Sequence, residues 1–149
     1  MITELSLWIL DYLDSHLYEE INIDTLSSFI GYDKSYIMKR FKKDVGVSIK
    51  TYLNQKKIIN SLKLLEDDSY LLNVALNSGF NSLEYYSEVF RRIIGVNPSG
   101  YRKYLLGVAS SEECLIIENS LLLLSEFEDK LDKERLKEEY ILSYKKKCA

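Results

Sequence analysis

Apolar residues recur every three or four positions along most of the chain, a spacing that places their side chains on one face of an α-helix. The pattern begins with the stretch from Leu5 to Leu17. It is longest over residues 48–65, which predicts one continuous helix with Ser48 as its N-cap. Six glycines and a single proline leave few helix breakers. We therefore predict an all-α protein.

One pattern of residues occurs twice in the first hundred positions. Seven residues return 49 positions later: Tyr36, Phe41, Lys42, Lys43, Gly46, Val47 and Tyr52 correspond to Tyr85, Phe90, Arg91, Arg92, Gly95, Val96 and Tyr101. Upstream the offset is 48: Leu26, Ser27, Gly31, Tyr32 and Asp33 correspond to Val74, Ala75, Gly79, Phe80 and Asn81. A repeat of this length indicates two duplicated subdomains.

Each copy has the sequence pattern of a helix-turn-helix. A short apolar-periodic segment ends at Gly31 or Gly79, where glycine adopts positive φ without steric cost. Asp33 and Asn81 follow two residues later, and we predict that each caps the next helix. That second helix buries two residues spaced by four, Ile37 with Phe41 and Tyr86 with Phe90. The fold class predicted is therefore two helix-turn-helix subdomains joined by the linker helix at 48–65.

The net charge of −3 conceals an uneven distribution. Residues 1–33 contain seven acids and no Lys or Arg, whereas residues 34–63 contain nine Lys and Arg against Asp44 alone. A dense cationic block favours an anionic partner, with nucleic acid the first candidate. On charge alone, a solvated helix face is an equal alternative.

Several classes of protein are excluded by what the sequence lacks. No apolar run approaches the roughly 18 residues of a membrane span. The two cysteines and His16 do not have metal-ligand spacing, so no metal is expected. No nucleophile–base pair or phosphate-cradling glycine loop occurs, so we expect no cofactor and no enzyme activity. The first cation is Lys34, which excludes a secretory signal and favours a cytoplasmic location.

These residues together resemble the DNA-binding domain of the AraC/XylS family of bacterial transcription regulators, over about residues 5–104. The family's second-half signature appears as Val74-Ala75, Gly79-Phe80, Tyr85-Tyr86, Phe90-Arg91-Arg92, Gly95, Pro98 and Tyr101-Arg102. The first half matches at Gly31, Ser35-Tyr36, Arg40, Phe41-Lys42, Gly46 and Tyr52-Leu53. The resemblance implies a sequence-specific regulator of transcription, by likeness an activator, that binds double-stranded DNA and inserts two recognition helices into successive major-groove segments. Those segments lie about 34 Å apart, and an 18-residue linker helix is about 27 Å long.

The resemblance and the helical spacing together assign candidate DNA contacts. We expect seven side chains to read bases: Ser35, Met38, Lys39, Leu83, Glu84, Ser87 and Glu88. Seven others are expected to contact phosphates: Lys34, Tyr36, Arg40, Lys42, Lys43, Arg91 and Arg92. Lys39 suits guanine and Met38 a thymine methyl group, while a core role is an equal alternative for Tyr36. The family commonly has a cation where Glu88 stands, so the second unit is expected to add less affinity than the first.

The sequence divides into an expected DNA-binding domain at residues 1–106 and an extension at 107–149. The extension is a short linker followed by one or two amphipathic helices that match nothing in the family. Packing back onto the domain, forming a homodimer and presenting a surface to a partner are all open for it. Few residues precede the first helix, so a separate ligand-sensing domain is expected to be absent. The alternative function is a protein-interaction module that binds another regulator or RNA polymerase, favoured by Glu88, Leu83 and the overall acidity.

Overall fold

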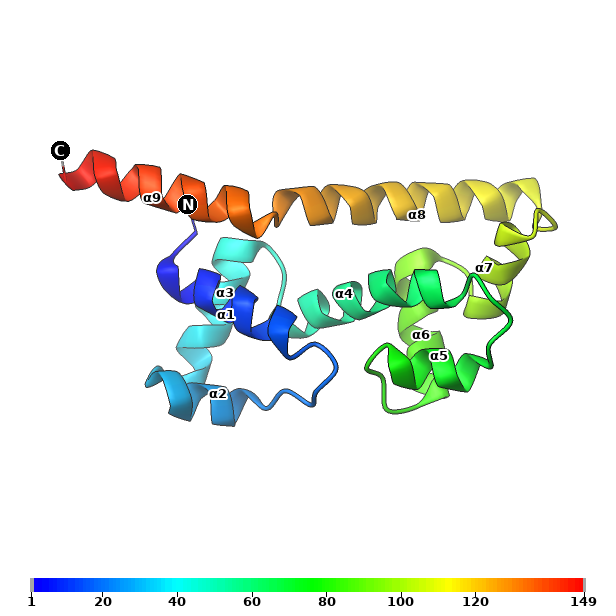
Figure 1. Cartoon of the computed structure of the whole chain (residues 1–149), viewed down its shortest axis with the longest axis horizontal. Helices are drawn as coiled ribbons and strands as arrows, with labels where there is room; N and C mark the ends of the chain where they lie inside the picture. The colour runs from blue at the N-terminus through cyan, green and yellow to red at the C-terminus, as the bar shows by residue number, and fades with distance from the viewer. Residues whose placement is uncertain (1, 149) are drawn as a thin grey trace. The chain divides into compact units, whose positions relative to one another are not determined.

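The computed structural model describes residues 2–148, and every regular element within them is an α-helix (Figure 1). The helices are α1 (Glu4–Ser15), α2 (Ile23–Ile30), α3 (Lys34–Val45), α4 (Ile49–Leu64), α5 (Leu71–Asn77), α6 (Leu83–Ile94), α7 (Pro98–Leu105), α8 (Ser111–Lys130) and α9 (Lys133–Cys148). The predicted all-α class, with two helix-turn-helix subdomains, a linker helix and a helical extension, is confirmed.

The chain forms two compact units. The first unit comprises Met1–Leu53 with Glu128–Ala149, and the second comprises Asn54–Phe127. The chain passes from the first unit to the second within α4 and returns within α8. The division expected from the sequence, at residues 1–106 and 107–149, stays a prediction about which part binds DNA, and its two terminal residues lie outside the described part of the chain.

The core of the first unit is built where α1 and α3 pack together. Ile9 and Leu10 on α1 and Ile37 and Phe41 on α3 are all fully buried. Phe41 also meets the ring of Tyr52 edge to face, with centroids 5.9 Å apart. These contacts confirm the expectation that Ile37 and Phe41 face inward.

Asp44 joins the first turn of α1 to the end of α3. Its Oδ2 accepts from the Thr3 backbone N–H at 3.0 Å and from the Ser6 hydroxyl at 2.8 Å, and its Oδ1 lies 3.0 Å from an Arg40 guanidinium nitrogen. The Thr3 hydroxyl also donates to the same carboxylate, at 2.5 Å. Burial alone would raise the pKa of Asp44, but the hydrogen bonds from Thr3, Ser6 and Arg40 outweigh it and hold the pKa below its usual value.

The second unit has its own core, in which α6 is the central helix. Tyr86, Phe90 and Ile94 of α6 are fully buried among residues of α4, α5, α7 and α8. The Tyr86 hydroxyl donates to Ser61 at 2.9 Å, so its polar end is satisfied inside the core. Arg102 on α7 donates to the backbone carbonyls of Leu65 and Ser69, which fixes α7 against the segment after α4.

The linker helix α4 matches its prediction closely. It runs from Ile49 to Leu64, and the Ser48 hydroxyl accepts from the Thr51 backbone N–H at 3.1 Å, which confirms Ser48 as the cap. Its sixteen residues give a length of about 24 Å. Pro98 begins α7, with Asn97 as its N-cap.

The extension packs back onto both units. In the second unit, α8 buries Ile117 and Leu124 in the core, and its Ser120 hydroxyl donates to the Ile94 carbonyl at 2.8 Å. In the first unit, α9 packs against α1 (Figure 1). There the Lys137 ammonium lies 3.1 Å from the Asp11 carboxylate. Of the roles left open for the extension, packing onto the domain is therefore observed.

Candidate nucleic-acid interface

The first helix-turn-helix is formed by α2 and α3. Gly31 ends α2 with φ 77° and donates its N–H to the Ser27 carbonyl at 2.9 Å. The Ser27 hydroxyl donates to the Tyr32 carbonyl, so the turn is tied to the body of α2. Asp33 then caps α3 by accepting from the Ser35 backbone N–H at 3.0 Å, as predicted. The turn and both helix ends are thus fixed by short-range bonds.

The second helix-turn-helix, formed by α5 and α6, differs by one residue. Gly79 again turns the chain, with φ 95°. The prediction that Asn81 caps the second helix is wrong, because Ser82 does so by accepting from the Tyr85 backbone N–H at 3.1 Å. The second copy has one extra residue in this turn, which is why the offset between the copies changes from 48 to 49. Because of that residue, α6 starts one position later than the first copy predicts, and Asn81 does not reach its first N–H groups.

The outward face of α3 is cationic and open. Ser35, Met38, Lys39 and Lys42 share this face, opposite the buried pair Ile37 and Phe41. All four are exposed, and Met38 retains 46% of its accessible surface. Lys43 is exposed beside them, near the C-terminal end of the helix. The predicted contact residues of the first unit are therefore presented on one helix.

Three other predicted phosphate contacts on α3 have partners within the chain. Lys34 lies 3.4 Å from the Asp24 carboxylate, an ion pair that is largely exposed. The Arg40 guanidinium forms an ion pair with the Asp44 carboxylate, whose side chain is almost fully covered, and this pair stabilises the first unit. Tyr36 stacks on Tyr32 with centroids 5.4 Å apart and remains half exposed, which places it on the surface rather than in the core.

The outward face of α6 has mixed charge. Glu84, Glu88, Arg91 and Arg92 are exposed, and Ser87 is partly buried. The Glu88 carboxylate pairs with the Arg92 guanidinium one turn away, at 3.0 Å. Because this pair neutralises one of the two arginines, α6 offers less positive charge than α3.

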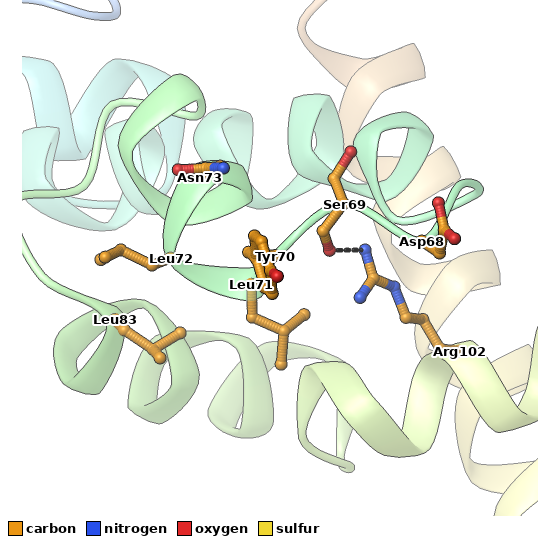
Figure 2. Close-up of a pocket in the computed structure, with 8 residues that line it drawn as sticks. All are labelled: Asp68, Ser69, Tyr70, Leu71, Leu72, Asn73, Leu83 and Arg102. Atoms are coloured by element: carbon orange, nitrogen blue, oxygen red, sulfur yellow. Dashed lines mark hydrogen bonds between the residues drawn. The ribbon is translucent and has the colours of Figure 1, made fainter.

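Leu83 is the first residue of α6, one turn before Ser87 on the same side of the helix. It is partly buried and packs against the core of the second unit. Figure 2 shows it near Leu71 and Leu72 of α5, with Arg102 at the far side of the group. These residues line a hollow of about 530 Å³. Leu83 therefore has a packing role in addition to the predicted contact with DNA.

Two basic residues of the cationic block are partly buried and make contacts within the protein. Lys57 of α4 is partly covered, and its ammonium lies 5.7 Å from the centroid of the Phe80 ring. Burial lowers the pKa of Lys57, although the nearby Tyr85 opposes the shift. Arg40 is the other. Sequence reasoning missed its bond to Asp44, although the lone acid of the block, four residues after an arginine, was the available signal.

Other kinds of site have no support in the described part of the chain. Residues 2–148 contain no group of three or more His, Cys, Asp or Glu placed to hold a metal ion. None of their helices combines the length and apolar character that crossing a bilayer requires.

Comparison with known proteins places this geometry in context. A family model described as a helix-turn-helix domain matches residues 26–104, more than half of the chain. The chain is 30% identical over 93 residues to an uncharacterised HTH-type transcriptional regulator of Staphylococcus aureus, and 29% identical over 97 residues to the regulatory protein PocR of Salmonella typhimurium. These matches cover 62% and 64% of this chain but only 12% and 32% of those proteins.

A solved structure confirms the fold. The DNA-binding domain of AdpA, a global transcriptional factor solved in complex with a target DNA, superposes with a TM-score of 0.61 at 24% identity. The match covers 68% of this chain and 93% of that domain. The aligned part of this chain therefore has nearly the whole fold of that domain. Helices α8 and α9 lie entirely beyond the segment that the family model matches.

Proposed function

The chain belongs to the AraC-type family of helix-turn-helix DNA-binding transcription regulators, and we propose that it binds its duplex site chiefly through the open face of α3. The observation that carries this proposal is the row formed by Lys39, Lys42 and Lys43. These lysines are exposed on a helix whose turn, cap and buried face are those of a recognition helix. The family is one of non-enzymatic regulators, which agrees with the expectation of no enzyme activity.

The roles of the side chains follow from their chemistry. We propose that Ser35, Met38 and Lys39 read base edges, because lysine donates to the acceptors of guanine and methionine packs on a thymine methyl group. Lys42 and Lys43 lie toward the end of α3, and we assign them to phosphates, which position a helix without specifying sequence.

The second unit is proposed to bind the next major-groove segment through α6. Glu84, Ser87 and Glu88 would face the bases, since a carboxylate accepts from cytosine N4. Arg91 and Arg92 would face phosphates, but Arg92 is shared with Glu88. We therefore propose that α3 supplies most of the affinity and that α6 mainly adds selectivity.

The partners beyond DNA are also proposals. We propose regulation as an activator through contact with RNA polymerase, and a homodimer through the C-terminal extension. A regulator that binds the bacterial chromosome works in the cytoplasm, so the proposal places the chain there. Since the chain spans 12% and 32% of the first two relatives, nothing of their full activity is transferred.

The proposal is tested by selecting tight binders from a pool of random duplexes and titrating the chain against the winner at several salt concentrations. We expect affinity to fall as salt rises, with a logarithmic slope of about −0.9 per phosphate contact. A scrambled duplex of equal length is the control and should bind more weakly. Equal affinity for both duplexes, or no binding at low salt, would overturn the proposal in favour of a protein-interaction module.

A further inference from the structure

Four aromatic side chains stack into a row on the surface of the first unit. Trp8 and Tyr12 of α1 have ring centroids 5.5 Å apart, and Tyr12 stacks in turn on His16 at 4.1 Å. Phe29 of α2 adds a fourth ring by stacking on Trp8, at 6.0 Å. We call Trp8, Tyr12, His16 and Phe29 the aromatic row.

The aromatic row is accessible to solvent. Phe29 is 77% exposed and Trp8 is 37% exposed, while Tyr12 and His16 are partly buried. The plane of the Trp8 ring differs by only 14° and 24° from the planes of its two partners. At these centroid separations the rings have the offset arrangement, in which neighbours overlap only in part. Contiguous exposed apolar surface of this kind marks an interaction site more often than scattered exposed residues do.

Exposed carboxylates stand at both ends of the part of the row that α1 carries. Glu4 lies one turn before the first ring, and its carboxylate accepts from the neutral Tyr140 hydroxyl at 3.3 Å. Glu19 and Glu20 follow the last ring, and the Glu19 backbone N–H donates to the His16 carbonyl at 3.0 Å, which keeps this turn beside the row. Among the described residues, no Lys or Arg is paired with any of these three glutamates.

Two lysines that reach α1 and α2 are already paired. The Lys137 ammonium of α9 lies 3.1 Å from the Asp11 carboxylate, and the Lys34 ammonium lies 3.4 Å from that of Asp24. Residues 1–33 themselves contain no Lys or Arg. The aromatic row therefore lies in a region of net negative charge.

From these observations we propose that the aromatic row is a docking site for an arginine-rich segment of a partner protein. The guanidinium group is planar, stacks on aromatic faces and pairs with carboxylates, so this one side chain complements both the rings and the charges of the surface. Lysine carries the same charge but lacks the planar group, so it should bind more weakly. The rings of α1 recur every four residues, about 6 Å along the helix, which a short segment can follow.

The charges decide against a nucleic acid as the occupant. Exposed aromatic side chains in other proteins stack the bases of single strands, but there a positively charged groove holds the phosphates. Here the surrounding carboxylates repel phosphates. The proposal thus adds a protein partner to the first unit, and it goes beyond DNA binding without depending on it.

The test uses the fluorescence of Trp8, the single tryptophan, which is itself part of the aromatic row. The full chain is titrated at low salt with alanine-based peptides of about 12 residues, ~18 Å as a helix, that carry Arg, Lys, Gln or Glu at every fourth position. The Arg peptide is expected to change the Trp8 emission saturably with a Kd below ~1 mM, and the Lys peptide to bind about twofold more weakly or worse. No saturable change with the Arg peptide, or equal binding of the Lys or Gln peptide, overturns the proposal.

Variants separate the aromatic row from a general attraction of cations to an acidic protein. Phe29→Ser is expected to raise the Kd of the Arg peptide about two- to fivefold, the loss of one exposed cation–π contact. Because Phe29 is 77% exposed, the change leaves the core intact. Tyr70→Ser is the matched control, since Tyr70 is an 81% exposed aromatic residue of the second unit. Equal affinities of these two variants would overturn the proposal.

The contribution of charge has its own pair of variants. Glu19→Gln with Glu20→Gln is expected to raise the Kd of the Arg peptide about twofold or more. Glu112→Gln with Glu126→Gln makes the same change of net charge at two exposed glutamates of α8 and should leave the Kd near that of the wild type. Equal effects of the two double variants would mean that the peptide responds to net charge alone, which contradicts docking at the aromatic row.

Nucleic acid is tested as the competing occupant. A single-stranded oligothymidylate of about 12 nucleotides, within the range of sites that stack bases on aromatic rings, is expected to leave the Trp8 emission unchanged. Phe29→Ser is expected to bind the selected duplex as the wild type does, because it alters no residue of α3. Saturation of Trp8 by the oligothymidylate, or loss of duplex binding by folded Phe29→Ser, would place the aromatic row in nucleic-acid binding and overturn the proposal.

Discussion

At the scale of single residues, the two recognition helices divide their side chains in the same way but carry different charges. Ile37 and Tyr86 are each the fourth residue of their helix, and both are buried, as the helical spacing predicted. The outward positions differ, since Lys39 of α3 is exposed and basic whereas Glu88 of α6 is acidic and paired with Arg92. This difference leads to predictions for each helix.

On α3, Lys39→Ala is expected to cost ~1–3 kcal/mol in DNA binding and to flatten sequence preference at the base it reads. Lys42→Ala is the comparison, because it should weaken binding to all sequences about equally and reduce the salt slope by ~1. Competition titrations with single-base variants of the site separate the two patterns. If both variants lose affinity uniformly, Lys39 is a phosphate contact and not a base reader.

On α6, Glu88→Gln is expected to strengthen DNA binding. The change removes a negative charge near phosphates and releases the Arg92 guanidinium from its ion pair. Both groups are largely exposed, so the gain should not exceed ~1 kcal/mol, about fivefold. Glu138→Gln on α9 provides a matched control at another exposed glutamate. Unchanged or weaker affinity of Glu88→Gln in the titration would argue that the carboxylate reads a base.

Asp44 gives the first unit a defined dependence on pH. Its pKa is lowered in the folded chain, so its stabilising contribution is present above the unfolded value of about 3.9 and is lost as pH falls through the folded pKa. Asp44→Asn should lower stability at pH 7 and should lose less of it between pH 5 and pH 3 than wild type does. Denaturant unfolding followed by fluorescence of Trp8, the single tryptophan, reports this unit. Equal acid sensitivity of the two proteins would assign the effect to other carboxylates.

The residue scale also shows what the sequence could not supply. Helical spacing identified the buried and outward positions of α3, because each depends only on local periodicity. The hydrogen bonds from Thr3 and Ser6 to Asp44 depend on where α1 lies in space, and no local pattern carries that information. The ion pair of Arg40 with Asp44 is different, because the spacing of four residues within α3 was a local signal that was missed.

At the scale of elements, the glycines that end α3 and α6 look equivalent in sequence but have different surroundings. Gly46 and Gly95 both adopt positive φ, at 93° and 96°. A Cβ at Gly46 would have open space, whereas one at Gly95 would collide with the Ile116 side chain of α8. The end of α6 therefore depends on glycine for conformation and for the approach of α8.

This contrast predicts that Gly46→Ala costs about 1–2 kcal/mol of stability through backbone strain alone. Gly95→Ala should cost about 1–3 kcal/mol more, because overpacking against Ile116 is added to the same strain. Urea unfolding of both variants measures the difference. Equal losses would mean that α8 yields to the added methyl group without cost.

The elements were largely predictable, and the exceptions have physical reasons. The helix start at Ser48 follows from capping chemistry and was predicted. The start of α6 was misplaced by one residue because both Asn81 and Ser82 are good caps, and the turn geometry decides between them. The packing of α8 over Gly95 could not be read from the chain, since a glycine that ends a helix gives the same signal whether or not another helix passes over it.

At the scale of the whole molecule, the account describes one chain that carries two reading helices on separate units. The helix α4 runs from the first unit into the second over about 24 Å, and successive major-groove segments lie about 34 Å apart. The proposed division of labour, with α3 giving affinity and α6 selectivity, requires that a single chain engage both segments.

Hydroxyl-radical footprinting tests this claim most directly. It is done on the selected duplex at nanomolar protein. The account predicts two protected patches about 10 base pairs apart on one face of the DNA. Lys42→Ala should weaken both patches, while a substitution of the bases contacted by α6 should remove only one. A single patch, or two patches on opposite faces of the duplex, would contradict it.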